Sequence, residues 1–182
     1  MLSRKRNSLL PLCLLLACCQ KVDLTVDPNT PTDESEEAVA IIGTGEGTRQ
    51  CPYTVTDIRS LSLSGDEAVW VIGYMVGTAP TSMNNASFSI DAKNQSNILL
   101  SNDSLCTDTA RCIPVELSSA KNRKSFSLPM NATHFRKCLL VKGTPLRYLY
   151  RKGLRDVSAG LWMDGFNISS VSPDEWGTIY LQ

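Results

Sequence analysis

Runs of β-branched and aromatic residues, separated by polar loops, predict a domain built from short strands. Five runs fit strands: 69–77, 97–101, 112–117, 138–150 and 154–162. Gly73 lies in the middle of the first run and predicts a bend there, while Pro114 marks the third strand as an edge strand or a bulged one. The spacing of these runs indicates one packed domain between residue 47 and residue 162.

Two short helical segments fit between the strands. Within 53–61, apolar residues recur at every third position and predict one apolar helix face. A turn of helix is expected at 131–137, between the third and fourth strands, with Asn131 as its N-cap. Five short strands with a helix in this place are the arrangement of an OB-fold, so the expected fold class is all-β with one or two short helices, forming an OB-like five-stranded Greek-key barrel.

The first twenty residues have the pattern of an export signal. Three basic residues at 4–6 precede an apolar stretch, 9–16, which is far shorter than the roughly 20 apolar residues that span a bilayer. The following Leu-Leu-Ala-Cys at 15–18 resembles a bacterial lipobox, in which the cysteine is acylated and becomes the new N-terminus. We expect Cys18 rather than Cys19 to carry the lipid, because Ala17 supplies the small residue at the cleavage point. A plain secretory signal is the alternative.

The predicted domain organisation follows from this start. The parts are a lipoprotein signal peptide at 1–17, an acidic flexible tether at 18–46, an OB-like domain at 47–162, and a C-terminal extension at 163–182 with a candidate added strand at 178–181. A lipid-anchored domain on an acidic, proline-containing tether stands off a membrane. We therefore expect a protein of the bacterial cell envelope, an outer-membrane lipoprotein, with its periplasmic or surface face left open.

Charge is balanced over the whole chain but uneven along it. The 18 basic and 18 acidic residues cancel, so net charge dictates no partner. Between residues 111 and 162, however, many basic residues are opposed only by Glu116 and Asp156. This excess can attract an anionic ligand. The favoured interpretation is a set of solvated strand edges and loops, where basic side chains discourage edge-to-edge pairing.

The cysteines suggest a staple rather than a metal site. Cys106 and Cys112 flank a five-residue polar turn, and the export signal places them where disulfides persist, so they form a candidate disulfide. Cys138 begins an apolar strand and is expected to be buried. With one histidine and no C-x-x-C motif, neither a metal nor another cofactor is expected.

Several segments, taken in order, resemble one family. They are 43–48 (GTGEGT), 51–56 (CPYTVT), 69–77 (VWVIGYMVG), 97–101 (NILLS), 112–117 (CIPVEL), 140–143 (LVKG) and 153–157 (GLRDV). This pattern resembles exported, often lipid-anchored proteins of the Bacteroidales that have an OB-like domain of unknown function. The resemblance covers about residues 43–162 and implies no catalytic residues. The long polar loop 80–96 and the extra cysteines depart from the usual pattern.

No catalytic arrangement emerges from the sequence. The glycines at 43–47 imitate a dinucleotide loop, but the third comes one residue early and Cys51-Pro52 follows where a helix is required. There is no G-x-S-x-G motif. His134 lies beside Arg136 and Lys137 without a carboxylate nearby in sequence to orient it. We therefore expect the protein not to be an enzyme.

Binding is what an OB-like domain offers, at the open face between its strand loops. The candidate ligand-binding residues are aromatic residues for stacking and basic residues for acidic groups: Tyr74, Tyr148, Tyr150, Arg147, Arg151, Lys152 and Arg155. The competing interpretation is that the aromatic residues form core. Tyr148 and Tyr150 have the same strand parity as Leu146, which predicts one shared face on the inside.

The sequence therefore predicts a non-enzymatic binding or assembly module, attached to a membrane through its lipid anchor, whose ligand is a surface glycan or an envelope protein. A nucleic-acid ligand is not excluded, so a single-stranded nucleic-acid-binding OB domain is one alternative. An accessory to a hydrolase is another. Ligand identity and oligomeric state do not follow from the residues.

Overall fold

The computed structural model describes residues 45–62 and 64–165. The expected signal peptide at 1–17, the cysteines at 18 and 19, nearly all of the expected tether, and the candidate strand at 178–181 lie outside these residues. Within the described part of the chain, no helix has the length and apolar character needed to cross a membrane.

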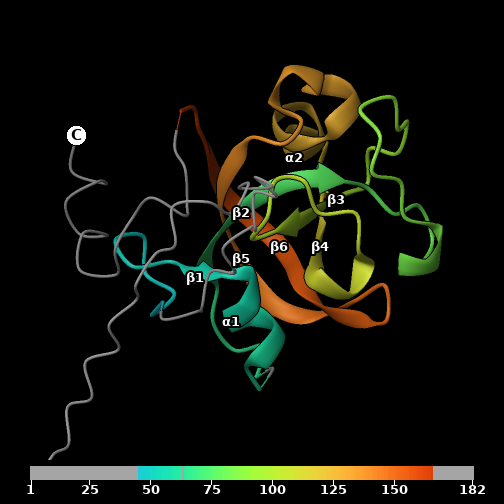
Figure 1. Cartoon of the computed structure of the whole chain (residues 1–182). Helices are drawn as coiled ribbons and strands as arrows, with labels where there is room; N and C mark the ends of the chain where they lie inside the picture. The colour runs from blue at the N-terminus through green and yellow to red at the C-terminus, as the bar shows by residue number, and fades with distance from the viewer. Residues whose placement is uncertain (1–44, 63, 166–182) are drawn as a thin grey trace, which may run out of the picture. The chain divides into compact units, whose positions relative to one another are not determined.

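The domain is mostly β-sheet, with short helices between the strands (Figure 1). The strands are β1 (Tyr53–Thr54), β2 (Val69–Gly77), β3 (Asn97–Ser101), β4 (Cys112–Glu116), β5 (Cys138–Tyr148) and β6 (Arg151–Met163). The α-helices are α1 (Val55–Ser60) and α2 (Ala120–Phe126), and the 3₁₀ helices are η1 (Met83–Asn85), η2 (Thr109–Arg111), η3 (Leu128–Met130) and η4 (Ala132–His134). The prediction of an all-β domain with short helices is confirmed.

The strand pairings form a closed circuit. β2 pairs antiparallel with both β3 and β5, β3 pairs antiparallel with β4, and β5 pairs antiparallel with β6. β4 and β6 lie parallel and are joined through the pair Val115 and Leu154. The pairings thus run β2-β3-β4-β6-β5 and return to β2, with β1 added parallel to β2 at one side.

Apolar side chains fill both sides of the central strand β2. Val71 and Met75 belong to a core cluster to which all five strands of the ring contribute. Ile72 and Val76, which alternate with them, belong to a second cluster on the opposite face. The segment after β2 covers this second face, because Met83 of η1 is buried in it. Burial on both faces explains why β2 is continuously apolar rather than alternating.

The prediction about Pro114 is corrected in part. β4 is not an edge strand, since β3 lies on one side of it and β6 on the other. The missing N–H of proline is tolerated because the parallel contact with β6 is confined to Val115. Gly153 of β6 lies directly against the Pro114 carbonyl, and a Cβ at that position would stand 2.3 Å from its oxygen.

Helix α1 is where the apolar spacing predicts it, and it is closed by a capping box. The Thr54 hydroxyl accepts from the Asp57 N–H, and the Asp57 carboxylate accepts from the Thr54 N–H at 2.7 Å. Val55 and Ile58 are buried against the main core. In Figure 1, α1 lies at the same end of the strands as the β5–β6 turn, and α2 lies at the opposite end.

The helical segment between β4 and β5 differs from the prediction. The α-helix there is α2, which begins after its cap Ser119, and the expected helix at 131–137 is reduced to the single turn η4. Asn131 does not cap it. Its side-chain amide donates to the Lys124 and Ser127 carbonyls instead, and so ties η3 back to α2.

Candidate functional site

The turn between β5 and β6 displays an aromatic ring to solvent. Tyr148 pairs with Arg151, so Leu149 and Tyr150 form a two-residue turn. Both have positive φ, 47° and 62°. A type I′ hairpin turn requires this conformation and usually takes asparagine and glycine, because a residue with a Cβ is strained there by about 1–2 kcal/mol. The Tyr150 residue at this strained position is 79% exposed, so burial does not offset its strain.

The prediction that Tyr148 and Tyr150 share an inward face is wrong. Tyr150 lies in the turn rather than in the strand, so strand parity does not apply to it. Tyr148 is half-buried, and its hydroxyl accepts a hydrogen bond from the Asn97 side chain at 3.4 Å. Asn97 also binds both backbone groups of Ala79, at 2.9 and 2.7 Å. This buried amide holds the start of the 78–96 loop beside the hairpin.

A hollow lies between this loop and the hairpin turn, and we call it the turn pocket. It has a volume of about 440 Å³. The residues that line it are Thr81, Arg147, Tyr148, Leu149, Tyr150 and Arg155. The structure therefore brings together four of the seven predicted ligand residues.

The two arginines of the turn pocket differ in their partners. Arg155 donates to Glu116 of β4 through Nε at 2.8 Å and through Nη2 at 3.4 Å, and this hydrogen bond raises the pKa of Arg155. Its charge is therefore already matched by a carboxylate. Arg147 is exposed and forms no ion pair with any residue of the described ranges. Arg147 is thus the cation that the turn pocket offers to a ligand.

Tyr74, which is also among the candidate ligand residues, does not line the turn pocket. It is 8% exposed and belongs to the second core cluster, packed among apolar residues. The core interpretation of this aromatic residue is the correct one, because β2 is covered on both faces.

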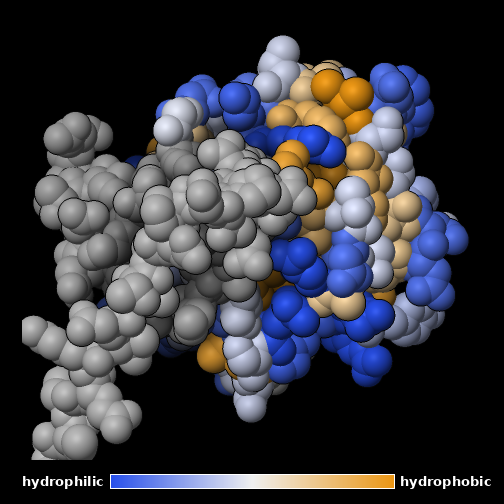
Figure 2. All heavy atoms as spheres, viewed as in Figure 1, coloured by the Kyte–Doolittle hydropathy of each residue, from blue (hydrophilic) through white to orange (hydrophobic). Residues whose placement is uncertain are grey.

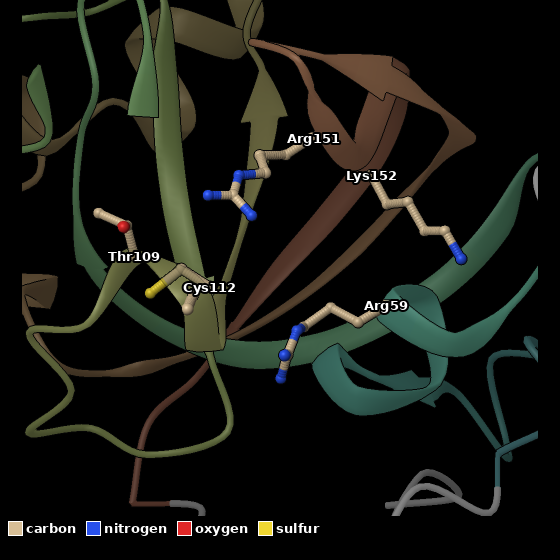
Figure 3. Close-up of a pocket in the computed structure, with 6 residues that line it drawn as sticks. Arg59, Thr109, Cys112, Arg151 and Lys152 are labelled. Atoms are coloured by element: carbon tan, nitrogen blue, oxygen red, sulfur yellow. The ribbon is translucent and has the colours of Figure 1, made fainter. Parts of the chain in front are cut away.

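Arg151 and Lys152 line a different hollow, which we call the arginine pocket (Figure 3). Its other lining residues are Arg59, Thr109, Ala110 and Cys112, and its volume is about 260 Å³. Arg59 comes from α1 and Thr109 from η2, so segments far apart in sequence meet β6 here. Sequence reasoning missed Arg59 and Thr109, because the basic excess that indicates Arg151 and Lys152 begins only at residue 111.

The structure also brings the candidate disulfide cysteines together. The sulfurs of Cys106 and Cys112 lie 3.9 Å apart, and each thiol approaches the Asp108 carbonyl. Burial raises the pKa of Cys112, with a smaller contribution from Cys106. Cys138 is buried as predicted, and burial raises its pKa as well.

His134 lies between an aromatic ring and an exposed carboxylate. Its ring stacks on Trp162, with centroids 4.4 Å apart, and its Nε2 lies 3.9 Å from the exposed Asp164 carboxylate. On the other side of the ring, the Thr133 hydroxyl lies 3.4 Å from His134 Nδ1. Over the residues that the structure describes, no group of three or more His, Cys, Asp or Glu side chains is placed to hold a metal ion.

Fold and site together define a mostly β domain with a ring of five strands and two cation-lined pockets beside one hairpin. The chain belongs to a family whose model is described as a domain of unknown function (DUF6359) and matches residues 53–163. The match begins with β1 and ends with β6, so it spans the whole ring. No curated protein and no solved structure matches the chain.

Proposed function

We propose that this protein is a non-enzymatic binding module of the bacterial envelope, tethered by a lipid on Cys18, and that it binds an acidic surface glycan in the turn pocket. The lipobox-like start supports the envelope location, because sequences of this pattern serve as signals for export and acylation. A domain that is exported and tethered to a membrane meets polymers of the cell surface. The order of motifs in this chain also resembles that of lipid-anchored proteins of the Bacteroidales.

We also propose that the ring is an OB-like Greek-key barrel. Numbered from β2, the pairings follow the order 1-2-3-5-4 and return to 1, with the parallel contact between the third and fifth strands. Helix α2 lies between the third and fourth strands of this numbering. In OB-folds, oligosaccharides and oligonucleotides bind beside the loops that follow the first and fourth strands. Thr81 and the turn at 149–150 belong to those two loops, which supports a ligand in the turn pocket.

The single observation that carries the proposal is the exposed ring of Tyr150 on a strained turn. The chain accepts positive φ at Leu149 and Tyr150 where glycine is free of strain, and strain of this kind concentrates at functional sites. A flat aromatic face suits a sugar ring, and Arg147 on the preceding strand suits a carboxylate through two parallel hydrogen bonds. Figure 2 shows hydrophilic residues at the end of the molecule that holds α1 and the hairpin turn, as over other parts of this face, so a ligand at this end would meet a polar surface.

Single-stranded nucleic acid is the second candidate ligand. The observation that favours it is the continuation of basic residues past Tyr150 into Arg151 and Lys152, which a phosphate backbone could follow. The two ligands differ in their response to salt. Binding to a polyphosphate weakens steeply as salt rises, because several counterions are released, whereas one arginine–carboxylate pair gives a shallow dependence.

The test is calorimetric titration of the full-length protein with three probes: an oligogalacturonate, a neutral cello-oligosaccharide of equal length, and single-stranded oligothymidylate. We expect saturable binding of the oligogalacturonate, lost in Tyr150→Gly and weakened about tenfold in Arg147→Gln, the loss typical of one charge-assisted contact. Met130→Ala is the matched control, because Met130 is also an exposed large side chain, at 57%, and lies on η3.

Binding of oligothymidylate alone would replace the glycan proposal with the nucleic-acid one. Binding of neither anionic probe, or binding that Tyr150→Gly leaves unchanged, would remove the turn pocket as the site.

A further inference from the structure

The arginine pocket carries positive charge that no described carboxylate neutralises. Three of its six lining residues are basic, and none is acidic. Neither Arg59 nor Arg151 forms an ion pair with any residue that the structure describes. Cations placed around one small hollow repel each other, and the hollow therefore favours an anion.

Three acidic residues that lie near the pocket residues in sequence have partners elsewhere. The Asp57 carboxylate accepts from the backbone and the hydroxyl of Thr54 at the start of α1. The Asp108 carboxylate accepts from the Ala110 N–H at 2.8 Å and caps η2. Asp103 pairs with Arg111 at 3.4 Å. Each of these carboxylates has a local partner, and none forms an ion pair with Arg59 or Arg151.

The side chains are arranged for one compact ligand. In Figure 3 the guanidinium groups of Arg59 and Arg151 both extend toward the side of the hollow that holds Thr109 and Cys112. Lys152 turns the other way, toward α1, where its ammonium group donates to the Leu61 carbonyl. This bond holds the end of α1 against β6, and so fixes the position of Arg59 relative to Arg151.

We propose that the arginine pocket binds a phosphate group. Each guanidinium is a planar fork that donates two parallel hydrogen bonds to a pair of oxygens, and a tetrahedral dianion has enough oxygens for both forks at once. The Thr109 hydroxyl supplies a further donor from the opposite wall. A single carboxylate would match only one of the two forks. The ligand is either inorganic phosphate or a sugar phosphate ester, and the pocket recognises the phosphate group of both.

This site is separate from the turn pocket and does not depend on the function proposed for it. The two hollows share no lining residue, although Tyr150 and Arg151 are consecutive in the chain. A variant that removes the Tyr150 ring should therefore leave phosphate binding intact. Conversely, the loss of the Arg59 fork should leave the turn pocket intact.

The test is calorimetric titration of the full-length protein at low ionic strength with inorganic phosphate and with glucose 6-phosphate, using sodium chloride to correct for salt. We expect saturable phosphate binding that weakens about tenfold or more in Arg59→Gln and in Arg151→Gln, as expected for removal of one charge-assisted pair. Lys121→Gln is the matched control, because Lys121 is an exposed cation on α2. Binding of both probes would identify the phosphate group itself as the ligand, whereas binding of the sugar phosphate alone would restrict the site to esters.

Arg59→Lys is a second variant in case Arg59→Gln fails to fold. It keeps the positive charge and removes only the planar guanidinium group with its paired donors. Affinity that falls in Arg59→Lys, with an unchanged thermal unfolding midpoint, supports the bidentate arrangement. Phosphate heats equal to those of chloride, or an affinity that Arg59→Gln and Lys121→Gln change equally, would overturn the proposal.

Discussion

Leu149 and Tyr150 are adjacent and both have left-handed backbone conformations, but packing compensates the backbone strain of Leu149 alone. Leu149 is partly buried against the second core cluster, whereas Tyr150 is 79% exposed. Burial of the leucine side chain offsets its strain, whereas the tyrosine ring is not packed in either core cluster of the described residues. The turn therefore keeps an energetically unfavourable residue whose side chain is presented outward.

Replacing Tyr150 with glycine should stabilise the domain. Glycine adopts positive φ without strain, and little buried area is lost with the ring, so we expect the free energy of unfolding to rise by about 1 kcal/mol. Equilibrium urea unfolding of the variant and the wild type measures this difference. A decrease would mean that the ring makes a stabilising contact in the folded protein, and the strain argument would fail.

Removing the carboxylate partner of Arg155 should raise affinity for anions. In Glu116→Gln the Arg155 guanidinium loses its charged partner and faces the turn pocket unmatched. Because this ion pair is exposed, the free energy of unfolding should change by less than about 1 kcal/mol. Titration with the oligogalacturonate should then give tighter binding than wild type. Equal or weaker binding would show that Arg155 contributes nothing to the pocket.

Oxidation should join Cys106 and Cys112. Exchange with oxidised glutathione forms the bond between the two sulfurs, which are 3.9 Å apart, and releases two molecules of reduced glutathione. Closing so short a loop is expected to stabilise the fold by about 2 kcal/mol. Intact-mass and peptide mass spectrometry, with Cys106→Ser as the control, would identify the bond. Glutathione remaining attached to either residue, with no internal bond, would contradict the prediction.

The reduced protein should lose stability in alkali. Burial raises the pKa of Cys112 and Cys138 above their ordinary value of 9.0, so these thiols stay protonated in the folded state. Above about pH 9 the unfolded chain ionises them and binds fewer protons than the folded chain, so the free energy of unfolding falls as pH rises. Urea unfolding between pH 8 and pH 10.5 measures the slope, and Cys138→Ala should make it shallower.

The sequence predicts the strands well because most of them are buried on both faces. The runs 69–77 and 97–101 coincide with β2 and β3, where apolar residues are continuous. Helix α2 is different. It buries only Asn122 and Phe126, and the Asn122 amide donates to the Val157 carbonyl at 2.7 Å. A helix held by one polar and one aromatic side chain has no apolar periodicity, so the pattern could not indicate it.

The candidate site is only partly visible in the sequence. The basic excess and the aromatic residues indicate Tyr150, Arg147 and Arg151, but strand parity places Tyr150 wrongly, because Leu-Tyr gives no sign of a type I′ turn. Arg59 precedes Arg151 by more than ninety positions, and only the pairing of β6 with the rest of the ring brings α1 beside it. Contacts of this range depend on topology, which local patterns do not contain.

The parallel contact of β4 with β6 gives the ring a seam. Over the described residues it rests on one residue pair, Val115 with Leu154, next to a proline that has no N–H to donate. The ion pair between Glu116 of β4 and Arg155 of β6 also joins the two strands. The arginine pocket is lined from both strands, by Cys112 of β4 and Arg151 of β6. Local opening of the ring should begin at this seam. An anion held in the arginine pocket would contact both sides of the seam, so its binding would make the domain more rigid.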